Sequence, residues 1–210
     1  MSKRPNIVFI LNDHQTYYRH GWDGGPRVQR PQFDRLARRG VEFSRAYTAC
    51  PLCGPARRTM LTGVFPHNHG EIKNDTNHPF DREVYLDLLA SAGYRCWYYG
   101  KWHAGSGTAL EHGCQGFSYP SYNNPYTKPE YKDYLKRRGL PEPEILIERS
   151  FWGPVIGGKP NLMRAGERYR QDRAWCNEHA SGLMLTPDDT HEAFFLANLA
   201  CERLKINGKK

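Results

Sequence analysis

The feature that most constrains the fold is a continuous apolar run from Ile7 to Leu11 near the N-terminus. Asparagines bound the run on both sides, and Asp13 and His14 follow it. A short unbroken apolar run of this kind is typical of a strand buried on both faces, in the middle of a parallel sheet. We therefore expect a strand over 6–12, with Asp13 at the sheet edge where ligands of open α/β sheets bind.

Helical and strand patterns alternate through the first hundred residues. Apolar spacing and end signals predict helices over 31–39, 55–62 and 81–92, and strands over 41–47 and 94–99. This alternation predicts an α/β fold, with a mostly parallel sheet sandwiched by helices. At 210 residues and 39% hydrophobic content, the chain can bury the core of a single domain.

The pattern changes over residues 104–185, which are rich in Pro, Gly, Tyr and Trp and show little periodicity. A stretch of this length predicts either disorder or an irregular insertion that covers a site. A strong helix start follows at 186–189, and the expected helix ends near Asn207. Aromatic residues of the insertion either line a substrate pocket or pack the loop itself: Tyr119, Tyr122, Tyr126, Trp152 and Trp175.

The run from Cys53 to Gly63 is Cys-Gly-Pro-Ala-Arg-Arg-Thr-Met-Leu-Thr-Gly. Pro55 suits a first helical turn and Gly63 suits a helix end, so position 53 is expected at a helix N-terminus. Free backbone N–H groups and the helix dipole favour a negatively charged ligand there, and Arg57 lies one turn further on. A sulfate or phosphate ester fits such a site.

Two other interpretations of Cys53 stay open on spacing alone. Cys50 and Cys53 form a Cys-x-x-Cys pair, which is typical of a redox-active pair or of half a zinc site. No second pair of closely spaced Cys or His residues completes a zinc site. A buried and inert cysteine at the start of a helix is the third alternative.

The run from Cys53 resembles the sulfatase signature, a Cys-x-Pro-x-Arg core with a Leu-Thr-Gly ending. Residues 100–103, Gly-Lys-Trp-His, resemble the second signature of the same family, although Cys96 and Tyr99 depart from its usual pattern. The resemblance implies an alkaline-phosphatase-like fold and the activity of a formylglycine-dependent sulfatase or a phosphonate monoester hydrolase. Taken without the family, Lys101 and His103 would more simply belong to a solvated loop.

The resemblance also implies roles for individual residues. Cys53 would be oxidised to formylglycine by a formylglycine-generating enzyme. One hydroxyl of the hydrated aldehyde would attack sulfur and release the alcohol, and collapse of the other hydroxyl to the aldehyde would expel sulfate. Arg57 and Lys101 would stabilise charge on the transferring group, and His103 would hydrogen-bond the diol.

A divalent metal ion is the cofactor that the resemblance implies, with Asp13 and the modified Cys53 among its ligands. Calcium is the first expectation. His14 stands where the family has a second acidic residue or Gln, so magnesium, manganese or zinc stay open. On pattern alone, Asp13 could also be a turn or helix-cap residue. His67 and His69 have a spacing that suits metal binding, but we expect them either to be structural or to support the site residues without direct chemistry of their own.

Charge indicates the class of partner. Lys and Arg number 30 against 22 Asp and Glu, a formal net charge of +8. The basic residues form no long stripe and no nucleic-acid-binding motif, so we expect no nucleic-acid partner. The same positive field suits a small anionic ester substrate. The apolar run at 7–11 is too short to span a bilayer, so we expect no membrane partner either.

Location and extent are further expectations. Six cysteines at irregular spacing do not suggest a disulfide framework, and the N-terminus leads straight into the expected core strand, so we expect a cytoplasmic protein. The sequon Asn74-Asp75-Thr76 is then a coincidence. Oligomeric state stays open.

Members of the resembled family are typically much longer and bring further metal ligands, a second lysine and a general-acid histidine. We find no counterparts here, so we expect residues 1–210 to form a single N-terminal domain that lacks the C-terminal part of the family fold. Two alternatives for function stay open. The same site could act on phosphonate monoesters or phosphodiesters, or the chain could be a catalytically incomplete binding or structural remnant.

Overall fold

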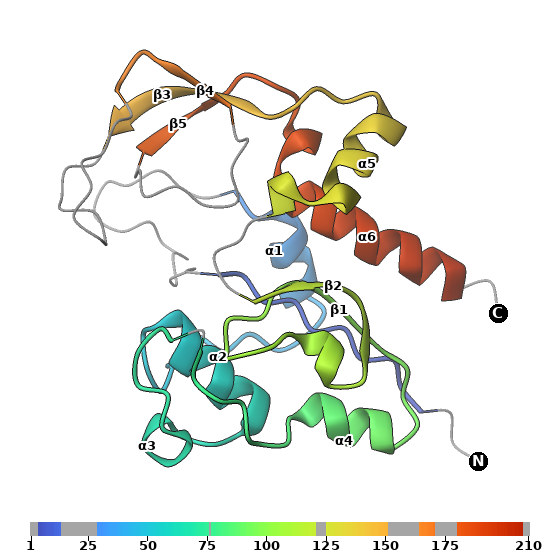
Figure 1. Ribbon diagram of the computed structural model, residues 1–210. Coiled ribbons are helices and arrows are strands. Elements are labelled where there is room, and N and C mark those ends of the chain that lie inside the picture. The colour runs from blue at the N-terminus through green and yellow to red at the C-terminus, as the bar shows by residue number, and fades with distance from the viewer. Residues whose placement is uncertain are drawn as a thin grey trace.

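The computed structural model of the protein describes residues 4–13, 29–75, 77–120, 125–150, 164–170 and 180–207. Figure 1 shows its elements in chain order. Strands β1 (Cys96–Lys101) and β2 (Cys114–Tyr119) pair in parallel, with Cys96 opposite Cys114 and Lys101 opposite Tyr119. The short 3-10 helix η1 (Ala109–Glu111) lies in the connection between them.

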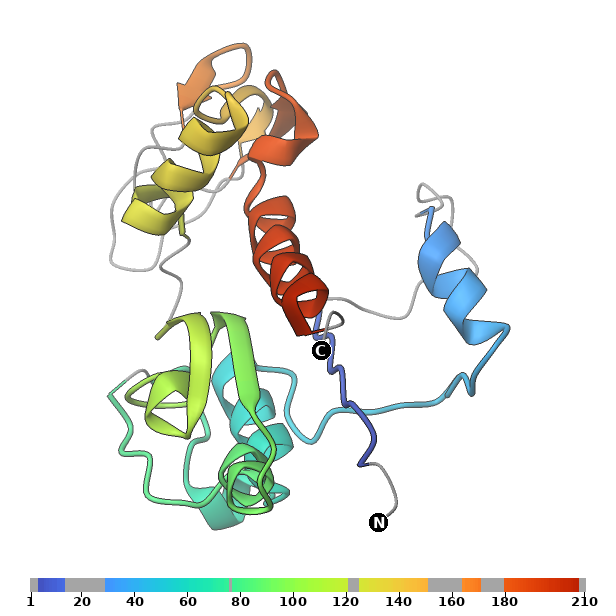
Figure 2. The same ribbon diagram turned by 90° about the vertical axis from the view of Figure 1, so that its right-hand side faces the viewer.

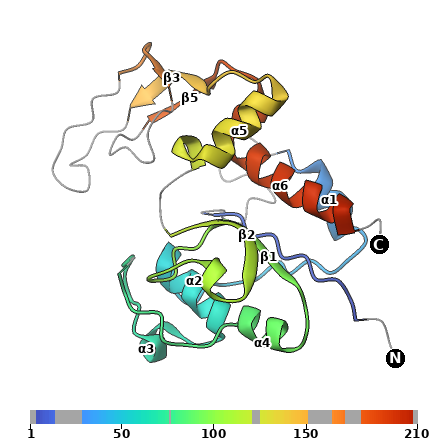
Figure 3. The ribbon, with the colours of Figure 1, turned by 45° about the vertical axis from the view of Figure 1, so that its right-hand side comes forward.

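Helices cover both sides of this parallel pair. In Figures 1 and 3, α2 (Cys53–Thr62) and α4 (Tyr85–Ser91) lie on one side of β1 and β2, and α6 (Glu192–Asn207) lies on the other. The short α3 (Pro66–His69) follows α2. Helix α6 packs on β1 at Gly100, where an added Cβ would lie 3.5 Å from Leu196. This layering confirms the predicted α/β class.

Two hydrophobic clusters form the core. In the first, the fully buried Trp102 follows β1 and packs with side chains from α2, the start of α4, the β1–β2 connection and β2: Leu61, Val84, Leu86, Ala104, Ala109 and Cys114. In the second, three residues of α5 (Pro129–Arg138) pack against Phe195 of α6: Tyr131, Tyr134 and Leu135. Trp102 lies between Lys101 and His103 in the sequence, so the first cluster anchors the segment that carries both residues.

Residues 104–185 are expected to form an irregular insertion. Where the structure describes them, they instead form regular helices and strands. Besides β2 and α5, they contain β3 (Glu144–Ser150), β4 (Arg168–Arg170) and β5 (Ala180–Met184), which form an antiparallel sheet in the order β4-β3-β5. The 3-10 helix η2 (Pro125–Thr127) directly precedes α5, and the 3-10 helix η3 (Asp188–Thr190) directly precedes α6. Tyr122, Trp152 and Trp175 lie outside the described residues.

The expected strands over 6–12 and 41–47 are absent from the described residues. Side chains from Ile7 to Leu11 are 42% to 67% exposed, and Val41, Phe43 and Tyr47 are more exposed still. A strand needs a neighbour to satisfy its backbone N–H and C=O groups. No described segment pairs with either stretch, so neither forms a strand.

Helix α1 (Pro31–Ala37) is shorter than the predicted 31–39 and buries none of its residues. Figure 2 shows it standing apart from the helices that cover β1 and β2. Among the described residues, no helix is both long and apolar enough to cross a membrane.

Candidate active site

Helix α2 places residue 53 at its N-terminal end, as predicted. The helix starts at Cys53, two residues earlier than expected, and stops at Gly63, whose φ of 70° lies in the left-handed region. Leu52 precedes the helix and provides no side-chain cap. Cys53 is a partly exposed free cysteine, as is Cys50. The partly exposed position at the positive end of the helix dipole suits an anionic ligand.

Asp13 brings the two sequence signatures together. Its Oδ1 accepts a hydrogen bond from Arg57 Nη2 at 3.0 Å, and its Oδ2 accepts one from Lys101 Nζ at 2.9 Å. Arg57 also donates to the carbonyl oxygen of Lys101 at 2.7 Å, and that carbonyl accepts a further bond from the hydroxyl of Tyr98 at 2.8 Å. Arg57 and Lys101 are therefore fixed side by side at the end of β1.

The charge state of Asp13 follows from these contacts. Partial burial pushes the pKa of Asp13 upward, but the hydrogen bonds and positive charges of Lys101 and Arg57 outweigh burial and leave the pKa below its ordinary value. Asp13 is therefore an anion at neutral pH, and its side chain stays 44% exposed.

His103 is completely buried and has a φ of 47°, in the left-handed region. Such a conformation costs a non-glycine residue about 1–2 kcal/mol, so the surrounding structure must enforce it. Backbone hydrogen bonds from Trp102 to Tyr119 and from His103 to Pro120 hold the segment against β2. Burial, together with the charges of Lys101 and Arg57, lowers the pKa of His103 to about 4. The imidazole is therefore neutral at neutral pH.

The two histidines of α3 lie away from these groups, consistent with a structural role. His69 is buried, and its Nε2 lies 3.0 Å from Thr59 Oγ1 on α2. His67 is exposed and stacks on Phe65. Asn74, whose sequon is expected to be a coincidence, accepts a hydrogen bond from the backbone N–H of Gly54 at 2.9 Å. Tyr98 and Asn74 are thus contacts of the site that the sequence patterns did not single out.

Asp13 has the chemistry of one ligand for a divalent metal ion. Hard cations such as calcium prefer about six to eight oxygen ligands, and Asp13 presents a partly exposed carboxylate at the site. His14 lies outside the described residues. Within the part of the chain that the structure describes, no three or more His, Cys, Asp and Glu side chains gather in a way that could hold a metal ion. Asp13 therefore fits such an ion, but the described residues do not build a complete site.

Comparison with known proteins identifies the family. The family model described as Sulfatase matches residues 5–196 of this chain. The chain belongs to the sulfatase family. The match extends from the N-terminal apolar run into the first turns of α6, so it includes both signatures and Asp13.

The similar proteins are sulfatases of longer length. An N-acetylglucosamine-6-O-sulfatase of Bacteroides thetaiotaomicron is 38% identical over 102 residues, which are 49% of this chain and 18% of that protein. An ulvan-active sulfatase of Formosa agariphila is 37% identical over 100 residues, 48% of this chain and 20% of that protein. The N-acetylgalactosamine-6-sulfatase of Homo sapiens is 32% identical over 114 residues, 48% of this chain and 22% of that protein. The matched part of the chain thus spans about a fifth of each of these relatives.

A solved structure from work on glycosaminoglycan metabolism by Bacteroides thetaiotaomicron aligns with 71% of this chain and 31% of its own chain. The TM-score is 0.41 and the sequence identity is 22%.

Proposed function

We propose that this chain acts in the hydrolysis of sulfate monoesters and that residue 53 supplies the nucleophile. The observation that carries the proposal is the convergence of Arg57 and Lys101 on Asp13. The two cations come from separate signature segments, 44 residues apart in the sequence. Two fixed positive charges beside α2 suit an ester that carries a negative charge.

Each residue of the site has a distinct task in this proposal. Arg57 and Lys101 bind the non-bridging oxygens of the ester and stabilise the charge that develops on them. Neutral His103 can donate a hydrogen bond from one ring nitrogen and accept one at the other, so it can orient an oxygen nucleophile at residue 53. Asp13 holds both cations in place.

Two groups absent from the sequence itself complete the proposed chemistry. Oxidation of Cys53 to formylglycine by a formylglycine-generating enzyme would supply an aldehyde whose hydrate carries the attacking hydroxyl. A divalent metal ion, held in part by Asp13, would add positive charge and make that hydroxyl more acidic. Calcium is our first candidate because the known donor is a carboxylate, and magnesium, manganese and zinc are the alternatives.

The substrate class that we propose is a sulfate ester of a sugar. The printed names of the relatives support this choice, because two act on N-acetylhexosamine 6-sulfates and one on ulvan. The same two cations would also accept a phosphonate monoester or a phosphodiester, so the sulfur preference needs a direct test.

A panel of 4-nitrophenyl esters provides that test. The chain, co-expressed with a formylglycine-generating enzyme, is assayed with calcium against the sulfate, a phosphonate monoester and a phosphodiester, and Cys53→Ala serves as the control. We expect hydrolysis of the sulfate above the other two esters and none by Cys53→Ala. Faster hydrolysis of a phosphorus ester would replace the proposed substrate. No hydrolysis of any ester would make this chain a catalytically incomplete one.

A further inference from the structure

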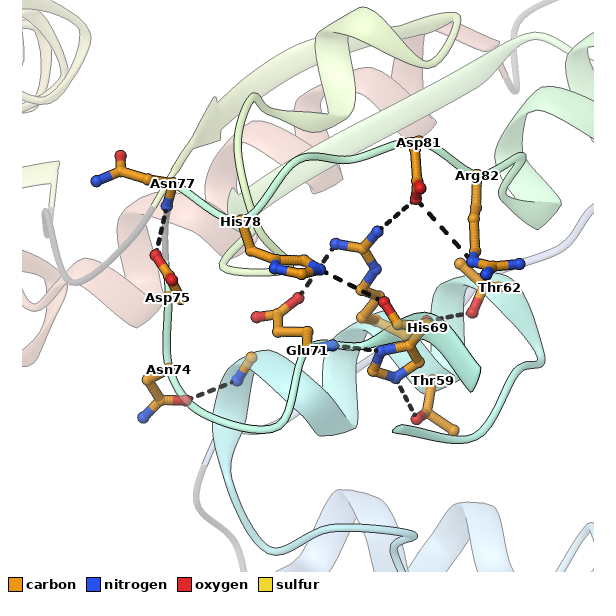
Figure 4. Close-up of polar contacts among 12 residues, drawn as sticks. Thr59, Thr62, His69, Glu71, Asn74, Asp75, Asn77, His78, Asp81 and Arg82 are labelled. Carbon is orange, nitrogen blue, oxygen red and sulfur yellow. Dashed lines mark hydrogen bonds and ion pairs between the residues drawn. The ribbon is translucent and has the colours of Figure 1, made fainter. Parts of the chain in front are cut away.

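We propose that Asn74 and Glu71, in the loop between α3 and α4, are positioning residues. They hold residue 53 at a fixed position relative to His103. This inference rests on the proposed function of residue 53. It concerns residues outside both signatures, and four observations support it. Figure 4 shows the loop and its polar contacts.

The first observation is the way in which the start of α2 is capped. The first N–H groups of a helix have no partner within the helix, and a side chain of the preceding residue commonly accepts from one of them. Leu52 cannot do so. Asn74 Oδ1 instead accepts from the N–H of Gly54, from 20 residues further along the chain, at 2.9 Å. The helix end next to residue 53 is therefore capped by the loop.

The second observation is the close approach of Glu71 to the same glycine. A Cβ added to Gly54 would overlap Glu71 Oε1 and would lie 3.4 Å from Asn74 Oδ1. Glu71 is 1% exposed, and neither of its side-chain oxygens has a hydrogen-bond partner among the described residues. Its nearest cation is Arg58 of α2, at 3.6 Å from Nη1 to Oε2 and also fully buried. Burying a carboxylate without hydrogen-bond partners costs folding free energy. We therefore infer that Glu71 has a function beside Gly54 that offsets this cost.

The third observation links the loop to the second signature. Gly105 lies two residues beyond His103 and has a φ of 93°. A Cβ at Gly105 would lie 2.6 Å from the carbonyl oxygen of His78, 3.1 Å from Arg58 Nη1 and 3.6 Å from Glu71 Oε2. The N–H of Ser106 donates to the same carbonyl at 2.8 Å. Thus the loop and Arg58 touch the backbone on the C-terminal side of both candidate catalytic residues.

The fourth observation is that the loop is itself anchored on α2. His69 Nδ1 accepts from the backbone N–H of Glu71 at 3.1 Å, so Nε2 carries the proton and donates to Thr59 Oγ1 at 3.0 Å. Arg58 Nη2 donates to Asp81 at 2.8 Å, and its guanidinium lies 4.7 Å from the centre of the Phe80 ring. A loop fixed at both ends can transmit its position to Gly54 and Gly105.

Together, these contacts mean that a change in the loop shifts residue 53 relative to His103 without touching a substrate. Small displacements of reacting groups can reduce a rate by about a hundredfold. A positioning role therefore predicts a fall in kcat that is larger than the change in KM.

The experiment compares Asn74→Ala, Asn74→Asp and Asn77→Ala in the chain that carries formylglycine. The aspartate keeps an oxygen that can cap Gly54, and Asn77 is an exposed residue of the same loop. We expect Asn74→Ala to lower kcat for 4-nitrophenyl sulfate by about tenfold to a hundredfold with a smaller change in KM. Asn74→Asp should restore most of that loss, and Asn77→Ala should match the wild type.

Hydrogen exchange of the Gly54 amide supplies a readout that does not depend on activity. We expect faster exchange at this amide in Asn74→Ala and near wild-type exchange in Asn74→Asp. Unchanged exchange, or faster exchange with unchanged kcat, would overturn the inference while leaving the proposed function intact. A wild-type chain that hydrolyses no ester would overturn the proposed function, and the exchange result would still decide whether Asn74 caps Gly54.

Glu71→Gln tests the buried carboxylate separately. The amide keeps the shape of the side chain and removes its charge, so the protein should stay folded. If Glu71 positions residue 53 with Arg58, the variant should lower kcat more than KM. Wild-type kcat in a folded Glu71→Gln protein would remove Glu71 from the proposal.

Discussion

Two regions of this molecule, both rich in apolar residues, are packed very differently. The signature region, residues 53–75 and 77–120, contains the whole first hydrophobic cluster, with Trp102 at its centre. The N-terminal region, residues 4–13 and 29–48, contains no buried residue. The difference shows that an apolar run becomes a core strand only where neighbouring strands and helices meet it.

The N-terminal region is nevertheless attached to the signature region, mainly through polar and aromatic contacts. Arg4 donates to the carbonyl oxygen of Ala92 at the end of α4, and the Phe9 ring lies 6.4 Å from that of Tyr85. Asp13 then pairs with Arg57 and Lys101. The site thus depends on a contact between a well-packed region and an exposed one.

The sharpest test of this comparison is the cost of truncating one apolar side chain in each region. Trp102→Ala should lower the free energy of unfolding by about 3–5 kcal/mol, because it opens a large cavity in the core. Val8→Ala should change it by less than about 0.5 kcal/mol, because Val8 is 66% exposed. Urea unfolding followed by fluorescence and circular dichroism measures both. A comparable loss in Val8→Ala would mean that the N-terminal run is buried after all.

The next effect concerns the cations at the junction of the two regions. Lys101→Ala should reduce kcat for a sulfate ester about a hundredfold, because one of the two charges that stabilise the transferring group is gone. Lys132→Ala, on the exposed face of α5, is the matched control and should retain activity. Steady-state kinetics with 4-nitrophenyl sulfate decides the matter, and equal rates for the two variants would place Lys101 outside the chemistry.

Glu71, the buried carboxylate of the signature region, should make the free energy of unfolding depend on pH. Burial raises the pKa of Glu71 to about 7, against the opposing effect of Arg58 and with a smaller rise from Asp75. The folded state then holds a proton that the unfolded state loses near its ordinary pKa of 4.5. Stability from this group is therefore present below about pH 4.5 and is lost as the pH rises toward 7.

Glu71→Gln isolates this contribution, because His69 also titrates nearby and its lowered pKa acts in the opposite direction as the pH falls. The stability of the wild type relative to Glu71→Gln should fall by a few kcal/mol at most between pH 4.5 and 7. Urea unfolding across this range gives the difference. A constant difference would show that Glu71 is already ionised at low pH.

The smallest effect is expected from weakening the contact of Asp13 with Arg57 and Lys101, which joins the two regions. Asp13→Asn removes the partly exposed charge that pairs with both Arg57 and Lys101 but keeps the shape of the side chain, so the free energy of unfolding should change by less than about 1 kcal/mol. Hydrogen exchange of residues 4–13 should nevertheless become faster, while that of α2 and β1 should not. Unchanged exchange in the N-terminal region would show that the apolar side chains, and not Asp13, hold it.

The parts of the fold that sequence could predict carry strong local signals. Pro55 and Gly63 predict that residue 53 lies at the start of a helix, and α2 confirms this. Helix α5 has equally clear local signals in Pro129, Gly139 and the spacing of its tyrosines, although it lies in the stretch expected to be irregular. Strand β2 has no such pattern, because Gln115, Gly116 and Ser118 interrupt its apolar residues.

The candidate site was predictable to the extent that the family motifs define it. The signatures named Arg57, Lys101 and His103, and the structure brings the first two onto Asp13. Asn74 and Glu71 reach Gly54 through contacts between distant positions, which no local pattern reveals. The cytoplasmic location and the identity of the metal ion stay predictions.

The most direct test of the central claim is the mass of the peptide that contains residue 53. The chain is co-expressed with a formylglycine-generating enzyme, digested and compared with the same chain made without that enzyme. Our account predicts a peptide about 18 Da lighter, because the thiol becomes an aldehyde, and ester hydrolysis that appears only in the converted sample. A peptide that keeps its thiol mass under these conditions, or conversion without any gain of activity, would contradict it.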